Sequence, residues 1–378
     1  MPEFGREPPA YLSEKVRVGK LTREDADMIL MFVNSEAGMV GHAVHTTLSN
    51  TRYISQTVEV IPHPQMWTND TINRFVAGIR GKYKANTTRK FIVLIKRFCL
   101  WLIERGLNRE LVTGELAKIK APAGDKITKT SAMMLSTDEI DKIVSSCRNT
   151  RDRCMISVLS ESGMRPFEVL NLKWKDLKID DYGCVINCAG KTGVPRFIRL
   201  VHSSPYISQW RNDHPFPRED SFIFVSLKDP KPDARITHTG LKKVVRLATQ
   251  RAGIVKKISP YIFRHSSVTR MLEEGYSDST IRMIHWGSQS TSMLTTYGHV
   301  SNPAIDAEVL AMSGIKKDQK KKERKPVNQC DKCQMIVLQS MTYCPRCSSP
   351  LTEDAREQRD RELRMIVKDI MDELRQGT

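Results

Sequence analysis

The chain has 378 residues, 40% of them hydrophobic, so it can bury more than one core and we expect two or three domains. Its formal net charge of +17 and pI of about 9.5 favour a polyanionic partner, nucleic acid first and an anionic membrane second, over a merely soluble basic protein. No apolar run approaches the roughly 20 residues of a membrane span, and the N-terminus MPEFGREPPAYL lacks the apolar core of a signal peptide. We therefore expect a cytoplasmic protein whose nine cysteines are reduced or bound to metal.

Residues 1–120 are predicted to form a small helical domain. Apolar residues recur at helical spacing in several stretches, and the strongest pattern covers 87–106 and ends at Gly106. Lysine and arginine residues cluster around the last two predicted helices, and Lys90 and Arg97 are the candidates for DNA contact among them. A solvated helix face explains these charges equally well, so both interpretations stay open.

Residues 121–135 are predicted to be a linker, because they contain proline and glycine without an apolar period. A second domain is predicted over 136–312, and it opens with the capping box Ser136-Thr-Asp-Glu139. Within it, Arg165 lies at a junction of two helices, with Glu168 one turn further on. Taken in isolation, a surface arginine paired with Glu168 explains this pattern better than catalysis does.

Two strand-like stretches, 184–188 and 196–201, flank the segment AGKTGVP, so a β-hairpin is predicted with Lys191 at or beside its turn. A phosphate-binding P-loop is excluded, because that motif opens a helix and here a strand follows. A loop that offers one lysine to a phosphodiester remains possible. Residues 237–252 are predicted to form a basic helix that contacts a DNA backbone through Lys242, Lys243 and Arg246.

The stretch 259–301 contains the strongest candidate for covalent chemistry. Tyr297 lies among polar and small residues, whereas a core tyrosine more often lies in an apolar run. An exposed tyrosine can form a covalent ester with phosphorus, and phosphoryl transfer needs cations such as Arg264 aimed at the charged oxygens.

The C-terminal region divides into a basic linker over 313–328, a zinc ribbon over 329–350 and an amphipathic helix over 351–378. The linker is either solvated or a DNA-binding arm. Two CxxC pairs at close spacing are typical of a tetrahedral zinc site, which we expect to be structural. Its ligands are Cys330, Cys333, Cys344 and Cys347. The apolar stripe of the last helix can pack on its own ribbon or dock on a neighbouring protomer.

In this order, the motifs resemble those of the tyrosine recombinase (phage-type integrase) family over roughly residues 15–312. The resemblance implies a mainly α fold with a small β-hairpin or sheet (α+β), in which a helical core-binding (SAM-like) DNA-binding domain precedes the catalytic domain. SGMRPFEVLNLKWKDL resembles the first arginine motif and SPYIFRH the second, which makes Arg165 and Arg264 the catalytic arginines. The hairpin Lys191 matches the general acid, and Tyr297 in TTYGHVS matches the nucleophile. The zinc ribbon and the His-Trp pair before the tyrosine are more similar to archaeal integrases than to bacterial ones.

Two positions depart from the family pattern. Tyr261 stands where the family commonly has His or Lys, and Ser288 stands where a His or Trp is expected nine residues before the nucleophile. His285 and Trp286 are close enough for a short insertion to restore either to the site. Tyr261, His285, Ser288 and Glu168 are therefore expected as supporting residues.

The resemblance implies a site-specific DNA recombinase that cuts and rejoins strands through a 3′-phosphotyrosyl intermediate, with no catalytic cofactor. The expected partners are double-stranded DNA attachment sites, and further copies of the chain in a dimer to tetramer on the nucleoid. Two alternatives share the fold: a type IB topoisomerase-like strand-passing enzyme, and an accessory DNA-binding protein whose activity is impaired at the altered positions.

Overall fold

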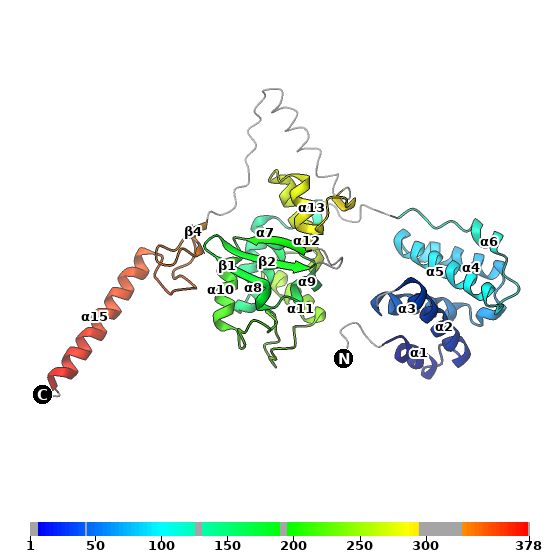
Figure 1. The fold of residues 1–378 in the computed structure, drawn as a ribbon, viewed down its shortest axis with the longest axis horizontal. Helices are drawn as coiled ribbons and strands as arrows, with labels where there is room; N and C mark the ends of the chain where they lie inside the picture. The colour runs from blue at the N-terminus through cyan, green and yellow to red at the C-terminus, as the bar shows by residue number, and fades with distance from the viewer. Residues whose placement is uncertain (1–6, 42–43, 125–130, 190–194, 295–326, 377–378) are drawn as a thin grey trace, which may run out of the picture. The chain divides into compact units, whose positions relative to one another are not determined.

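The computed structural model describes residues 7–41, 44–124, 131–189, 195–294 and 327–376 (Figure 1). The chain divides into two compact units, Met1–Thr128 and Lys129–Thr378, and each is described by itself. The fold class predicted from the motifs, mainly α with a small antiparallel sheet, is confirmed. None of the described helices is long and apolar enough to cross a membrane.

The first unit is a helical bundle built around the longest of its helices, α5 (Ala85–Glu104). The apolar face of α5 packs in one core with those of α2 (Arg23–Val40) and α4 (Asn69–Lys82). In this core Phe98 of α5 packs against Phe32 of α2 with ring centroids 5.0 Å apart. Threonine side chains accept a backbone N–H at the starts of α2 and α4, which satisfies donors that a helix leaves free. The other helices are α1 (Pro8–Arg17), α2 (Arg23–Val40), α3 (Val44–Val60), α4 (Asn69–Lys82) and α6 (Thr113–Lys118).

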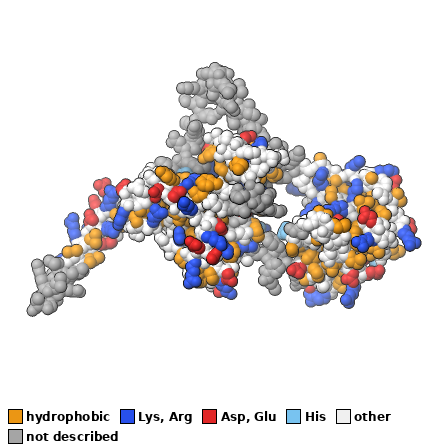
Figure 2. Space-filling view, in the orientation of Figure 1, with side chains coloured by type: hydrophobic (Ala, Val, Ile, Leu, Met, Phe, Trp, Pro, Cys, Tyr) orange, Lys and Arg blue, Asp and Glu red, His pale blue; other side chains and the backbone are white. Residues whose placement is uncertain are grey.

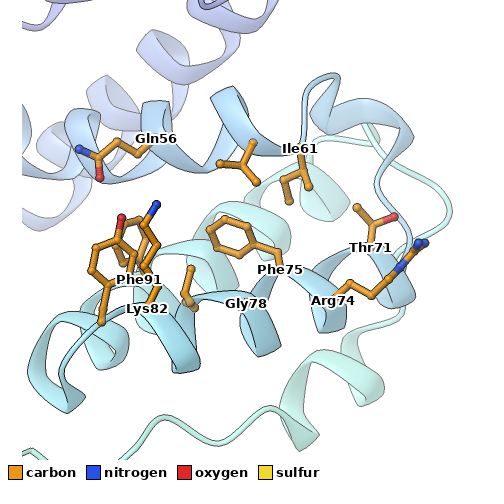
Figure 3. A pocket seen from close by; sticks show the side chains of 11 residues that line it. Gln56, Ile61, Thr71, Arg74, Phe75, Gly78, Lys82 and Phe91 are labelled. Atoms are coloured by element: carbon orange, nitrogen blue, oxygen red, sulfur yellow. The ribbon is translucent and has the colours of Figure 1, made fainter.

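A hollow of about 510 Å³ opens in this unit between α3 and α4 (Figure 3). Phe75 and Ile61 line it, with Arg74 and Lys82 at its edge. Arg74 is 2.8 Å from the carboxylate of Asp70 on the same helix.

The second unit has a large core of helices that packs against one face of a three-stranded antiparallel sheet, ordered β1-β2-β3. The predicted hairpin is present as β2 (Gly183–Ala189) and β3 (Pro195–Leu200), with Ile186 opposite Ile198. The sequence did not predict the edge strand β1 (Leu177–Asp180). The helices are α7 (Thr137–Ser145), α8 (Thr150–Ser162), α9 (Pro166–Leu170), α10 (Ser204–Asp213), α11 (His238–Arg251), α12 (Pro260–Glu273) and α13 (Asp278–Trp286). The predicted capping box forms at the start of α7.

A small ribbon and a long helix end the chain. The ribbon pairs β4 (Val327–Gln329) with β5 (Ile336–Leu338), and it contacts the sheet and α10. Asn212 donates to the Pro345 carbonyl at 2.6 Å, and Gln329 donates to the Asp181 carbonyl at 3.0 Å. The last helix is α15 (Glu353–Gln376), and over residues 353–368 acidic and basic side chains are interspersed along its surface (Figure 2).

Candidate active site and metal centre

Arg165 is held at a turn between two helices. Helix α8 ends at Gly163, whose φ of 57° is left-handed, and Arg165 then caps α9 with Pro166 as the first helical residue. Glu168 accepts the Arg165 backbone N–H at 2.8 Å and its Nη1 at 3.0 Å. The Arg165 side chain is still about one-third exposed, at 32%, so its guanidinium can meet a ligand while Glu168 orients it.

Arg264 lies one turn into α12 and is buried, at 6% exposed. Its Nη1 donates to the Gly163 carbonyl at 2.7 Å, and its Nη2 donates to the His285 carbonyl at 2.8 Å. These two carbonyls belong to the ends of α8 and α13, which are distant in sequence. Arg264 therefore fixes the turn that holds Arg165 to the helix that leads towards Tyr297.

The three candidates at the end of α13 lie in different surroundings. The His285 side chain is fully buried, and burial together with the nearby Arg264 guanidinium holds its pKa well below the usual value, so its ring is neutral. Ser288 is partly exposed and lies 3.0 Å from the Ser290 hydroxyl. Trp286 presents its ring to a catalytic candidate, because the Arg264 guanidinium lies 5.3 Å from the ring centroid.

Arg196 on β3 is a functional candidate that sequence reasoning missed. Its side chain is 1% exposed, its Nη2 lies 2.6 Å from Glu168 Oε2, and its Nη1 donates to the His285 carbonyl at 2.8 Å. Burial disfavours the ionised form of Glu168, but the hydrogen bonds from Arg196 and Arg165 outweigh it and lower the carboxyl pKa below the usual value. The signal was present in the alternation of β3, where Arg196 shares the inward face with Ile198 and Leu200.

The remaining candidates are Lys191, Tyr297 and Tyr261, of which the structure describes only Tyr261. Lys191 and Tyr297 lie outside the described residues. Lys191 falls between the ends of β2 and β3, and Tyr297 falls three residues after Leu294, which packs against Val268 and Ile281. Tyr261 lies on the first turn of α12 and is 46% exposed.

The predicted DNA-contacting residues divide into two groups. Lys242, Lys243 and Arg246 are exposed on α11, opposite the face that enters the core. In the first unit Lys90 instead donates to Ser49 at 2.8 Å and lies over the Tyr53 ring, and Arg97 pairs with Glu36. Other basic side chains of that predicted cluster hold the chain after α6, since Arg89 donates to the Pro122 carbonyl and Lys96 to the Ile119 carbonyl.

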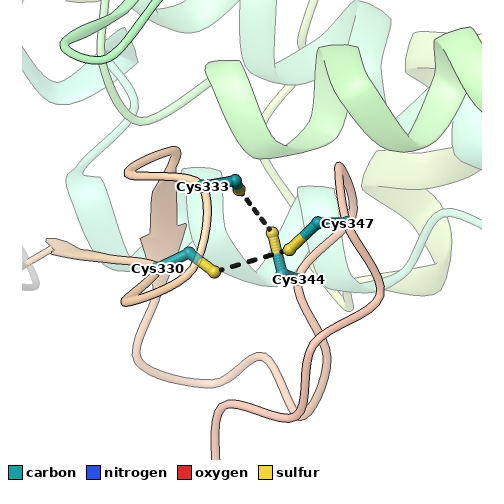
Figure 4. A group of neighbouring side chains, drawn as sticks. All are labelled: Cys330, Cys333, Cys344 and Cys347. Atoms are coloured by element: carbon teal, nitrogen blue, oxygen red, sulfur yellow. Dashed lines mark hydrogen bonds between the residues drawn. The ribbon is translucent and has the colours of Figure 1, made fainter.

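The four ribbon cysteines converge at one point (Figure 4). All four Sγ atoms lie within 4.8 Å of one another, with Cys330 3.7 Å from Cys347 and Cys333 3.5 Å from Cys344. Four thiolates at about 2.3 Å from a tetrahedral zinc are about 3.8 Å apart, so the cluster fits zinc.

The backbone around the cysteines supports this assignment, because the two CxxC turns repeat the same hydrogen bonds. Gln334 N–H donates to the Cys330 carbonyl at 2.8 Å, and Ser348 N–H donates to the Cys344 carbonyl at 2.9 Å. Gln334 and Ser348 both have a left-handed backbone φ, 57° and 55°, which residues other than glycine adopt only under constraint. Two equivalent strained turns that point four thiols at one spot are typical of a zinc ribbon.

Comparison with known proteins agrees with this geometry. Residues 133–303 match the phage integrase family. The chain is 28% identical over 260 residues to the tyrosine recombinase XerD of Oceanobacillus iheyensis, which covers 64% of this chain and 83% of the relative. It is 24% identical to XerD of Listeria monocytogenes over 72% of this chain and 92% of the relative.

Solved structures share the fold. A lambda integrase dimer bound to a core site aligns with a TM-score of 0.54 and 17% identity, covering 71% of this chain and 96% of the other. The XerH site-specific recombinase bound to its palindromic substrate aligns with a TM-score of 0.55 and 16% identity, covering 81% and 95%.

Proposed function

This chain belongs to the tyrosine recombinase (phage integrase) family, and from that premise we propose that it is a site-specific recombinase or integrase whose reaction is carried by Arg165, Lys191, Arg264 and Tyr297. The activity of the family is the cutting and rejoining of DNA strands. The single observation that carries the residue assignment is the hydrogen bonding of Arg264 to the carbonyls of Gly163 and His285. It joins the two arginine motifs and the approach to Tyr297 in one place.

In the proposed reaction, the Tyr297 phenol oxygen attacks the scissile phosphorus and loses its proton. A 3′-phosphotyrosyl ester forms as the bond to the 5′-oxygen breaks, and Lys191 gives that oxygen a proton. Arg165 and Arg264 bind the non-bridging oxygens, on which negative charge builds up. A later attack by a 5′-hydroxyl reverses these steps and rejoins the strand, so the energy of the ester is conserved.

The supporting positions are part of the proposal. Glu168 orients Arg165, and Tyr261 occupies the first turn of α12 where it can approach a phosphate. At the end of α13 the proximity of Trp286 to Arg264 favours Trp286 over Ser288 and over the buried His285 as the third phosphate contact. The family position nine residues before the tyrosine would then be served by a residue two places earlier.

The architecture follows from the same premise. We propose that residues 1–120 bind DNA on one side and residues 136–312 on the other, with exposed Lys242, Lys243 and Arg246 against the backbone. Double-stranded recombination sites are the substrates, and a dimer to tetramer assembles on them, as lambda integrase does in its solved structures, a dimer bound to a core site and a tetramer bound to a Holliday junction. A cytoplasmic, nucleoid-associated location follows from a DNA substrate. The similarity to archaeal integrases stays a prediction.

Zinc is proposed as a structural ion of the ribbon, held by Cys330, Cys333, Cys344 and Cys347. The four-cysteine site leaves no open coordination position, so it is built for folding and takes no part in strand transfer.

The test uses nicked suicide duplexes that carry candidate attachment sequences, with wild type beside Tyr297→Phe. We expect a protein–DNA adduct stable to SDS in the wild type and none in the variant. Tight binding without an adduct from either protein, on any substrate, would favour the impaired accessory protein, for which the departures at Tyr261 and Ser288 are the supporting observation. Relaxation of supercoils by a monomer without strand exchange would favour the topoisomerase-like alternative.

A further inference from the structure

We propose that Arg196 is the positioning residue that locks the two catalytic arginines and the end of α13 into one arrangement. The proposal rests on the recombinase function above. It adds a fifth side chain, which does not touch DNA, to the four that the family motifs indicate.

The contacts of Arg196 reach both arginine motifs. On one side its Nη2 lies 2.6 Å from Glu168 Oε2, and the other oxygen of that carboxylate accepts the Arg165 guanidinium at 3.0 Å. On the other side its Nη1 donates to the His285 carbonyl at 2.8 Å, the same oxygen that accepts Arg264. The Glu168 carboxylate therefore links Arg165 to the buried guanidinium of Arg196, and the His285 carbonyl links Arg264 to it.

Burial makes this linkage firm. The Arg196 side chain is 1% exposed and Glu168 10% exposed, so water competes little for either charge. A buried ion pair is weak evidence for stability, because desolvation offsets its attraction, but its geometry is well defined by the fixed planar donors of arginine. The fixed geometry, more than any gain in stability, is what the site requires, since small displacements of charged groups about a phosphate greatly reduce the rate.

The position of Arg196 in the chain adds a third connection. It is the second residue of β3, directly after the loop that contains Lys191, and the His285 carbonyl is at the C-terminal end of α13 before the segment with Tyr297. One side chain thus links the elements that carry Arg165 and Arg264, from the strand that follows Lys191 in the sequence to the helix that precedes Tyr297. Lysine at this position has a single ammonium and no planar fork, so it cannot reproduce both contacts.

The experiment measures the rate and the final amount of covalent adduct in single turnover on a suicide duplex, for wild type, Arg196→Met and Arg196→Lys. We expect Arg196→Met to slow adduct formation by about 100-fold while the final amount approaches that of wild type. Arg196→Lys should fall between the two. Arg199→Met is the matched control: it lies three residues away on the same strand, pairs with Asp180 at 2.6 Å and is one-third exposed, and it should keep the wild-type rate.

A purely structural role predicts a different result. If Arg196→Met only reduces the folded fraction, the final amount falls and the rate of the folded molecules is unchanged, which would overturn the proposal. Arg196→Lys keeps the buried charge balanced with Glu168, so it gives the same comparison should the methionine variant fail to fold.

A second substrate separates positioning of the arginines from positioning of Lys191. A 5′-bridging phosphorothiolate has a sulfur leaving group that needs no general acid. We expect the defect of Arg196→Met to be the same on the oxygen and sulfur substrates, and rescue by sulfur would assign Arg196 to the hairpin lysine instead and overturn the proposal. Failure of the recombinase function itself looks different, because the wild type would then give no adduct at all.

Discussion

At the residue scale, His285 contributes to the site through its backbone carbonyl, while its side chain is buried in the core. Its carbonyl accepts hydrogen bonds from Arg264 and Arg196. Its ring fills the space beside Gly163 and lies near the cations Arg264, Arg196 and Arg270. The ring is neutral in the folded protein because burial and these cations lower its pKa well below 6.5. In the unfolded chain it gains a proton near pH 6.5.

This difference predicts a pH dependence of stability. Above about pH 6.5 the ring is neutral in both states and contributes no slope. As the pH falls below that value only the unfolded state binds the proton, so the free energy of unfolding should fall by up to about 1.4 kcal/mol per pH unit. His285→Leu should reduce this slope between about pH 6.5 and 5, measured by urea unfolding of both proteins, and buried His214, whose pKa is also lowered, should keep part of it in both. Parallel wild-type and variant curves would show that His285 titrates normally.

At the element scale, the junction between α8 and α9 depends on a glycine. Gly163 has a φ of 57°, and a Cβ there would lie 2.1 Å from His285 Cε1 and 2.8 Å from Ser267 Oγ. The left-handed turn and the close approach of α12 and α13 are thus both needed to place the carbonyl that Arg264 binds.

Gly163→Ala should therefore lower the free energy of unfolding by more than the strain of a left-handed backbone alone would. Gly253→Ala is the matched control, because Gly253 has a φ of +68° but no atom within 4 Å of the added Cβ. We expect about 1–2 kcal/mol of strain in each variant and about 1–3 kcal/mol more for Gly163→Ala from the clash. Denaturant unfolding measures both, and equal losses would mean that His285 and Ser267 move aside freely.

At the scale of the whole molecule, the charge of +17 is used in several ways. Some cations hold the protein's own backbone, as Arg89 and Lys96 do, whereas Lys242, Lys243 and Arg246 are exposed on α11. If one of these three exposed residues neutralises a phosphate, changing it to glutamine should reduce the slope of log affinity against log salt by about 0.9. Lys175→Gln is the control, since Lys175 is exposed but pairs with Asp220. A triple variant with an unchanged slope would place DNA elsewhere.

The ribbon is the other prediction at this scale. A unit of about 20 residues has little core of its own, so metal binding should supply its folding free energy. We expect one zinc per chain by metal analysis, loss of the ribbon's protection from proteolysis on chelation, and recovery when zinc is added back. Absence of zinc, together with unchanged folding of Cys330→Ser and Cys344→Ser, would remove the metal assignment.

The sequence by itself determined the features that depend on local patterns. Helical periodicity located α5, the Ser136 capping box located α7, two strand-like stretches around a Gly-rich segment located the β2–β3 hairpin, and CxxC spacing located the four-cysteine cluster. These features could be predicted because caps, periods and ligand spacings act over a few residues. The first helix and the edge strand β1 were missed because their local signals are weak.

Only the tertiary structure decided how the motifs act together. The sequence offered His285, Trp286 and Ser288 as equivalent neighbours, and packing buried the first, set the second beside Arg264 and left the third partly exposed. It gave no role to Arg196, because the partners of that guanidinium lie 28 residues before it, at Glu168, and 89 residues after it, at His285. Contacts between distant residues depend on how helices and strands pack, and no local pattern encodes that packing.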